Sequence, residues 1–404
     1  MATGTLSLHP VAHARSGGWS AVFALTLCVA TLIASEFMPI SILTPIASDL
    51  GVTEGNTGQA IAVSGLFAVL TSLSLSWLTA GMDRRTLLLG LAVLMLVSGL
   101  TVALAPNFAV FIVGRALIGI VIGGFWSMSA ATVMRLLPEN GVPRGLAMLN
   151  GGNALATTVA APLGSFLGQY IGWRGAFFVV VPLAIMTFVW LWRTLPQMPS
   201  ARGGKAASAL GVLRKPAARL GMAAVALLFM GQFALFTYLR PFLETVTDLS
   251  ISLLSLVLLA MGAAGLIGTW LIGRVIARSL TTTLIFAPLV MAAIALGLVV
   301  TGTIPVATAA LLAGWGLVGT AIPVAWWTWL SRTLPEDVEA GGGLMVAVVQ
   351  LAITLGAGGG GVLFDVAGYR ATFIASAALL IGSAVLALLG ARRSATTATA
   401  PSVA

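Results

Sequence analysis

Apolar runs of about 20 residues recur along the whole chain, and they restrict its fold more than any other feature. Each run is long enough to cross a hydrocarbon core of about 30 Å as a helix. Of the 404 residues, 59% are hydrophobic and 8% are charged, which is far from the composition of a soluble domain. We predict twelve helical spans, at about residues 19–45, 57–79, 86–105, 108–134, 145–167, 175–193, 219–239, 251–272, 281–300, 306–330, 344–363 and 371–390.

The basic residues indicate how the chain is oriented, because cytoplasmic loops of membrane proteins are enriched in Lys and Arg. With both termini inside, only Arg174, Arg240 and Arg370 of the 20 basic residues face outside. Arg115 lies within a span, and the remaining sixteen are cytoplasmic. We therefore expect a multi-pass protein of the inner (plasma) membrane with both termini cytoplasmic. Because the positive charge is not clustered in one domain, we expect no nucleic acid partner.

Few residues are available for other chemistry. Cys28 is the single cysteine, which excludes internal disulfides and cysteine-based metal sites. His9 and His13 both lie in the N-terminal tail, and the chain has no Gly-x-x-x-x-Gly-Lys-Ser/Thr loop for ATP. We therefore expect no enzyme activity, no metal site and no cofactor.

The two halves of the chain match at an offset of about 196 residues. The matched pairs are "SEF" (35–37) with "GQF" (231–233), "LTP" (43–45) with "LRP" (239–241), "RLLPE" (135–139) with "RTLPE" (332–336), and "GWRGAF" (172–177) with "GYRATF" (368–373). Four matches in register indicate a duplication, with parallel halves related by an axis along the membrane normal.

A polar segment separates the halves. Residues 194–218 are rich in Pro, Gly, Ser and basic residues, which is typical of a flexible linker. We predict an all-α polytopic membrane protein of two six-helix bundles. Its parts are a cytoplasmic N-terminal tail (1–18), an N-terminal bundle (19–193), a cytoplasmic linker (194–218), a C-terminal bundle (219–390) and a cytoplasmic C-terminal tail (391–404).

This organisation resembles the major facilitator superfamily over the whole chain. The segment "AGMDRRTLL" is similar to the Gly-x-x-x-Asp-Arg-x-Gly-Arg signature of that family, and it keeps Asp83, Arg84 and Arg85. Both signature glycines are replaced, one by Thr79 and one through a shortened loop. The resemblance implies that these three residues form a loop that takes part in conformational change.

Span four carries a second motif of the superfamily. "GRALIGIVIGG" keeps an Arg-x-x-x-Gly-x-x-x-Gly pattern as Arg115, Gly119 and Gly123. In span five, "AAPLGSFLG" is similar to the antiporter motif only through Pro162 and nearby glycines.

Four longer segments narrow the resemblance to the proton-coupled exporters of drugs and sugars, and among these to the purine ribonucleoside efflux pumps. They are "EFMPISILTPIASDLGVTEGNTGQ", "GFWSMSAATVMRLLP", "GQFALFTYLRP" and "WWTWLSRTL". The resemblance implies a proton antiporter that exports nucleosides such as inosine and guanosine by alternating access. We expect the protein to be a monomer. Sugars or drugs are the alternative substrates, and a channel or a non-transporting receptor is the alternative class.

Glu36 is the one acidic residue within a predicted span. An ionised carboxylate at the centre of a membrane costs about 2.5–3.5 kcal/mol on insertion scales, so Glu36 should face a wet cavity or a partner. Burial disfavours the charged form of a carboxyl group, which would let Glu36 exchange a proton near neutral pH. Pro39 has no N–H, so the carbonyl of Ser35 loses its helical partner nearby. A static charge that serves packing is the alternative interpretation.

Arg115 is the expected partner of Glu36. Counted from the outer ends of their spans, the two residues differ in depth by about 3 Å, at about 1.5 Å per residue. The resemblance places both spans on a central cavity, so movement of Arg115 could change the proton affinity of Glu36. A purely bracing role is the alternative. Trp126 lies on the same helical stripe as Arg115 and could stack on a purine, or else pack against lipid or protein.

The remaining substrate-binding candidates are amides and tryptophans. The repeat places Gln232 at the position of Glu36, where an amide can hydrogen-bond to a nucleobase or ribose but cannot ionise. Asn153 and Gln350 are similar polar candidates in spans five and eleven, and contact between helices is the alternative role. Trp326 and Trp327 could stack on a ligand, or belong to an aromatic belt at the cytoplasmic end of span ten.

Overall fold

The computed structural model describes residues 18–78, 81–138, 141–199, 209–334 and 338–398, and all regular elements in these ranges are helical. Thr79 and most of the predicted N-terminal tail lie outside the described residues. The first half contains α1 (Gly18–Ser41), α2 (Leu43–Leu50), α3 (Glu54–Leu78), α4 (Arg84–Ala103), α5 (Phe108–Leu136), α6 (Val142–Phe178) and α7 (Val180–Thr194). The second half contains η1 (Ala209–Arg214), α8 (Pro216–Phe236), α9 (Leu239–Thr245), α10 (Ile251–Arg278), α11 (Leu280–Thr301), α12 (Pro305–Gly319), α13 (Ile322–Thr333) and α14 (Val338–Ala398).

Ten segments of the described residues are long and apolar enough to cross a membrane. Two of them, Arg144–Thr194 and Gly341–Arg393, contain 51 and 53 residues, which is enough for two spans each. These two segments turn at Gly172 and Gly368, whose φ angles of 72° and 73° are open to glycine and strained for other residues. The twelve predicted spans and the all-α fold class are therefore confirmed. The two glycines are also 196 residues apart, as the repeat predicts.

Spans one and seven are interrupted at equivalent positions. Ile42 separates α1 from α2, and Thr237 and Tyr238 separate α8 from α9. Pro45 and Pro241 lie in the first turn after each break and have no N–H for the carbonyl four residues earlier. The prolines of "LTP" and "LRP" thus account for two helix breaks that hydropathy alone does not reveal.

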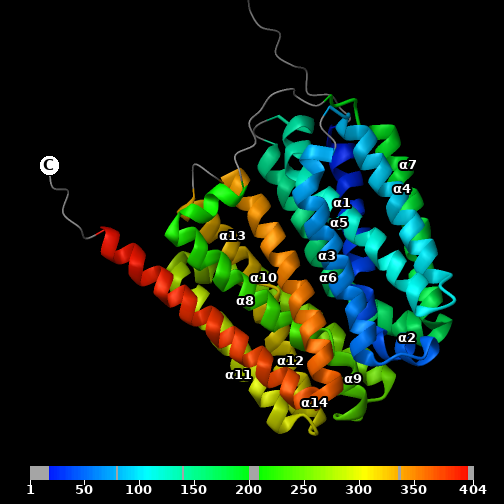
Figure 1. Cartoon of the computed structure of the whole chain (residues 1–404), viewed down its shortest axis with the longest axis vertical. Coiled ribbons are helices and arrows are strands. Elements are labelled where there is room, and N and C mark those ends of the chain that lie inside the picture. The colour runs from blue at the N-terminus through cyan, green and yellow to red at the C-terminus, as the bar shows by residue number, and fades with distance from the viewer. Residues whose placement is uncertain (1–17, 79–80, 139–140, 200–208, 335–337, 399–404) are drawn as a thin grey trace, which may run out of the picture.

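The two halves are bonded to each other toward one end of the molecule. We call this the far end: it contains α2 and α9, which contact each other in the lower part of Figure 1. The turns at Gly172 and Gly368 belong to the same end, because Arg174 bonds to Asp49 of α2 and Tyr369 packs against Phe242 of α9. The opposite end, where α1 begins and α7 ends, is called the linker end. Several hydrogen bonds between the halves lie in the far-end part of the spans. These bonds join Thr53 and Gly55 to Asp365, Gln59 to Gly358, Ser255 to Ser165, and Arg240 to Ser41.

Small residues bring the helices of the first half into close contact. A Cβ atom placed on Gly119 or Gly123 of α5 would lie 2.2 Å from a backbone oxygen of α3, that of Ser64 or Ala68 respectively. Glycines spaced by four residues lie on one helical face and let two backbones approach. The motif in span four therefore packs α5 directly against α3 and holds Arg115, one turn earlier, at that interface.

Candidate functional site

Glu36 is buried where the two halves meet. Its side chain on α1 keeps 1% of its surface exposed. Its carboxyl group lies within electrostatic range of the Arg115 guanidinium and within interaction range of the Gln350 side chain. Arg115 comes from α5 of the same half, whereas Gln350 comes from α14 of the other half. We call Glu36, Arg115 and Gln350 the Glu36 cluster.

The guanidinium of Arg115 bonds mainly to main-chain atoms. Arg115 is fully buried, and one terminal nitrogen donates to the carbonyl oxygen of Ser35 at 2.7 Å. The other terminal nitrogen donates to the carbonyl oxygen of Glu36 at 3.0 Å and to Ser64 Oγ at 3.2 Å, and Nε donates to the carbonyl oxygen of Ala60 at 3.4 Å. Within the described residues, Arg115 forms no ion pair with the Glu36 carboxylate. The arginine thus joins α1, α3 and α5 and leaves that carboxylate without a salt bridge.

Pro39 explains why Arg115 reaches the main chain of α1. In a continuous helix, the N–H of residue 39 would donate to the carbonyl of Ser35, but proline has no N–H. The sequence predicts this loss, and the structure shows that Arg115 replaces the missing donor. A charged donor forms a stronger bond than the amide that it replaces.

Gln232 makes an analogous contact in the second half. Its Nε2 donates to the carbonyl oxygen of Gly319 at 3.4 Å. Gly319 ends α12, and Pro323 follows four residues later without an N–H for that carbonyl. This contact was not predicted above, and Pro323 is the one signal for it in the sequence. Gln232 Oε1 is buried without a protein partner.

The two repeats meet at Phe37 and Phe233. Their rings stack with centroids 5.7 Å apart and an angle of 29° between the ring planes. The two residues are equivalent at the offset of 196, and equivalent residues of two parallel repeats can touch only beside the axis that relates them. Glu36 and Gln232, the preceding residues, are therefore placed close to this axis.

Two more candidates are buried and carry polar atoms without a protein partner. Gln350 is 8% exposed and its Oε1 has no partner, apart from the proximity of its side chain to Glu36. Trp326 is 2% exposed, packs edge-on against Trp329 at 5.5 Å, and its indole N–H has no acceptor.

Three candidates are not joined to the Glu36 cluster. Trp126 is half-buried and packs edge-on against Phe125 at 6.1 Å. Asn153 is half-buried on α6, and Trp327 on α13 is 45% exposed. Within the described residues, none of the three forms a hydrogen bond or ring contact with the cluster.

Asp83, Arg84 and Arg85, which we call the Asp83 loop, join the start of α4 to the end of α7 and the residues after it. Asp83 caps α4 by accepting from the backbone N–H of Arg85 at 2.7 Å, and its second oxygen accepts from the N–H of Met198 at 2.8 Å. The backbone N–H of Arg84 donates to the Met198 carbonyl at 3.1 Å. The Arg85 guanidinium donates to the carbonyl of Trp192 at 2.8 Å. This loop lies at the linker end, away from the bonds between the halves.

The chain has close curated relatives. It is 59% identical over 382 residues to the transcription regulatory protein OpdE of Pseudomonas aeruginosa (strain PAO1), covering 94% of this chain and 95% of the relative. It is 40% identical over 368 residues to the purine ribonucleoside efflux pump NepI of Salmonella typhimurium (strain LT2), covering 91% of this chain and 93% of the relative.

Solved structures with low sequence identity share the fold. A D-xylose-proton symporter aligns with a TM-score of 0.75 at 15% identity, over 91% of this chain and 97% of the symporter. A bacterial homolog of the human lysosomal transporter Spinster aligns with a TM-score of 0.72 at 16% identity, over 94% and 98% of the two chains. The family model described as Major Facilitator Superfamily matches residues 23–345. The chain therefore belongs to the major facilitator superfamily, a family of multi-pass membrane transporters.

Proposed function

We propose that the protein is a proton-coupled antiporter that exports purine ribonucleosides such as inosine and guanosine across the inner membrane. The observation that carries the substrate assignment is the 40% identity, over 91% of this chain, to a protein named purine ribonucleoside efflux pump. Sugars or drugs are the alternative substrates within the same superfamily.

The contacts of Glu36 support proton coupling. Its carboxyl group is buried and forms no salt bridge with Arg115, whose hydrogen bonds go mainly to carbonyl oxygens. The carboxyl group is therefore not held as one partner of an ion pair, which favours its exchange of a proton. Because Gln350 approaches it from the other half, separation of the halves would change the surroundings of the carboxyl group. Arg115 acts in this proposal as a nearby positive charge that favours the ionised form of Glu36.

The energetics of antiport are adequate for export. One proton that enters in exchange for a neutral solute moves one charge inward, which supplies about 2.3 kcal/mol per 100 mV of membrane potential. At about 1.4 kcal/mol per tenfold, this supports an outward gradient of about 50-fold. A single titratable group such as Glu36 is sufficient for this stoichiometry.

The unpartnered buried atoms support a polar substrate. Gln232 and Gln350 each offer an amide oxygen, and Trp326 offers an indole N–H. A nucleoside carries ribose hydroxyl groups that can donate to the amide oxygens, and ring nitrogens that can accept from the indole. Buried polar atoms are costly when unpaired, so pairing with them contributes to binding. Trp126, Asn153 and Trp327 complete the proposed substrate-binding set, as stacking or polar residues that the solute contacts along its path.

The distribution of basic residues supports a cytoplasmic linker end. In this orientation, the bonds between the halves close the outward side, and the Asp83 loop lies on the cytoplasmic side. We assign Asp83, Arg84 and Arg85 to the conformational change between the two access states. The proposed transporter functions as a monomer and needs no cofactor.

A second candidate function is a membrane receptor that changes transcription without transporting a solute. The name of the 59% identical relative, a transcription regulatory protein, is the observation that favours it. The two candidates differ in one measurable property, because a receptor can bind a ligand without moving it across the membrane.

Counterflow of radiolabelled inosine into proteoliposomes tests the proposal. Liposomes loaded with unlabelled inosine should accumulate the label transiently, and external guanosine should suppress this accumulation. D-xylose serves as the competitor that represents the sugar alternative, and protein-free liposomes give the background. If inosine binds to the purified protein but no label accumulates, the receptor function is favoured. If inosine neither binds nor exchanges, the nucleoside assignment is wrong.

A further inference from the structure

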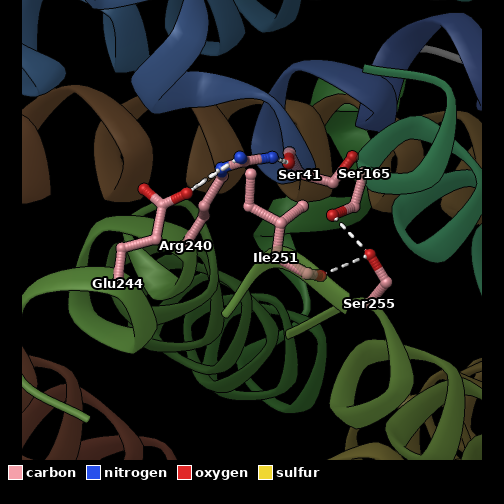
Figure 2. Close-up of polar contacts among 6 residues, drawn as sticks. All are labelled: Ser41, Ser165, Arg240, Glu244, Ile251 and Ser255. Atoms are coloured by element: carbon pink, nitrogen blue, oxygen red, sulfur yellow. Dashed lines mark hydrogen bonds and ion pairs between the residues drawn. The ribbon is translucent and has the colours of Figure 1, made fainter. Parts of the chain in front are cut away.

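Arg240 reaches from the break in span seven into the break in span one. Arg240 on α9 is buried, and its side chain donates from one terminal nitrogen to the carbonyl oxygen of Ser41, the last residue of α1 (Figure 2). Its Nε and its other terminal nitrogen both contact Glu244 Oε1 at 2.8 Å. One guanidinium therefore bonds to both halves at once.

The carbonyl of Ser41 is available because Pro45 follows it. The N–H of residue 45 would donate to this carbonyl in a continuous helix, and proline offers none. The carbonyl also belongs to the last turn of α1, where the helix dipole attracts a cation. Its position and charge both suit a guanidinium.

Glu244 determines where the guanidinium of Arg240 points. The two residues are four apart on α9 and form an ion pair, with side chains 4% and 20% exposed. Glu244 neutralises a charge that would be costly to bury alone, and it holds one edge of the guanidinium. The opposite edge is thereby directed at Ser41.

A second bond between the halves lies beside this one. Ser255 Oγ on α10 lies 2.7 Å from Ser165 Oγ on α6 and 2.9 Å from the Ile251 carbonyl oxygen (Figure 2). Because a hydroxyl group has one proton, Ser255 can donate to only one of these two oxygens at a time. The serine bond joins two neutral groups, whereas the Arg240 bond is charge-assisted and stronger. Opening of the far end must break both of these bonds, together with those of Asp365 and Gln59, and the Arg240 bond contributes more than the serine bond to keeping this end closed.

We propose that Arg240 is the latch of the far end: its bond to the Ser41 carbonyl holds the two halves closed, and its release allows this end to open. Arg240 is a positioning residue in this role, because it acts on the main chain of span one. Ser41 lies five residues after Glu36 on the same helix, about 7.5 Å along its axis. Release of the latch therefore frees the helix that carries the proposed proton site. The role of Arg240 does not depend on which solute is carried.

Disulfide trapping in native membranes measures closure of the far end without any substrate. In a Cys28→Ala background, Ser165→Cys and Ser255→Cys place two thiols where the hydroxyl groups are now 2.7 Å apart, which is within reach of a disulfide when this end is closed. The readout is the initial rate of disulfide formation with a mild oxidant. Arg240→Met should lower this rate by about tenfold, as expected for loss of a charge-assisted hydrogen bond.

Arg174→Met is the matched control. Arg174 is also an arginine of the far end, but its bonds go to Asp49 and to the Ala105 carbonyl within the first half. Its substitution should leave the rate of disulfide formation unchanged. An equal loss of rate in the Arg174 and Arg240 variants would overturn the proposal, as would an unchanged rate in Arg240→Met.

Pro45→Ala tests the same bond without changing the arginine. Alanine restores an N–H that competes with Arg240 for the Ser41 carbonyl, so disulfide formation should slow by severalfold. This variant also decides the matter if Arg240→Met does not insert or fold. An unchanged rate of disulfide formation in Pro45→Ala would then show that the bond from Arg240 to the Ser41 carbonyl does not hold this end closed.

Discussion

Arg115 donates a hydrogen bond of 2.7 Å to the carbonyl oxygen of Ser35, an oxygen that Pro39 leaves without its helical donor. A buried carbonyl without a partner costs about 1–3 kcal/mol, so the arginine offsets a local defect of span one. The same bond fixes the height of the guanidinium beside Glu36. Helix irregularity and placement of charge are thus linked in this site.

The relationship recurs at two other prolines. In each case a proline removes the donor to the carbonyl four residues earlier, and a polar side chain from another helix supplies a replacement. The three sets are Pro39, Ser35 and Arg115; Pro45, Ser41 and Arg240; and Pro323, Gly319 and Gln232. Such replaced bonds can be exchanged during a conformational change, which a continuous helix does not allow.

A double-mutant cycle tests the link between Pro39 and Arg115. Arg115→Met leaves the carbonyls of Ser35 and Glu36 without this donor. We expect the free energy of unfolding to fall by about 2–5 kcal/mol, measured as a lower unfolding midpoint in detergent. Pro39→Ala restores an N–H for Ser35, so it should recover about 1–2 kcal/mol in the Arg115→Met background. Strictly additive effects of the two substitutions would mean that Arg115 does not replace the donor that Pro39 lacks.

Glycine substitution tests the close packing of α5 on α3. In Gly123→Ala, the new Cβ atom would lie 2.2 Å from the Ala68 carbonyl oxygen, so the helices must separate, at a cost of about 1–3 kcal/mol. Gly151→Ala on α6 is the control, because no atom lies within 4 Å of its Cβ position, and its stability should be unchanged or raised by up to about 1 kcal/mol. Unfolding midpoints of both variants in detergent give the comparison. Equal midpoints would contradict the backbone contact between α3 and α5.

Gln232→Glu should make transport depend on pH in a defined direction. A protonated glutamic acid can donate to the Gly319 carbonyl, whereas an ionised one cannot and is repelled by that oxygen. Exchange of inosine without a pH gradient should therefore be retained at low pH and fall, relative to wild type, as pH rises. Gln232→Met lacks a titratable group and should show the same relative exchange at every pH. A Gln232→Glu variant that is most active at high pH would exclude the proposed bond to Gly319.

Much of the fold could be predicted from local features of the sequence. The apolar runs give the spans because the membrane thickness sets their length, and the repeated "GWRGAF" and "GYRATF" segments place both sharp turns. The same repeat places Glu36 opposite Gln232, and the stacked rings of Phe37 and Phe233 agree with an axis between them. These features need only spacing along the chain.

The partners within the site could not be predicted in this way. Counting residues from the outer ends of the spans places Arg115 at the depth of Glu36. This count does not give the rotation of α5 about its own axis, which directs the guanidinium to carbonyl oxygens. A helical stripe likewise places Trp126 on the face of Arg115 without showing which helix that part of the face meets. Trp126 instead packs edge-on against Phe125. Contacts between helices depend on the packing of the whole bundle, so a pattern within one helix cannot determine them.

Glu36→Gln tests the proposed proton coupling most directly. The substitution keeps the shape of the side chain, gives span one the residue that span seven already has at this position, and removes the titratable group. Transport of radiolabelled inosine is measured in proteoliposomes, once as exchange at equal pH and once against a gradient with an imposed pH difference. We expect the variant to retain exchange and to lose the uphill, proton-driven transport of the wild type. Uphill transport that persists in Glu36→Gln would show that the coupling proton binds elsewhere.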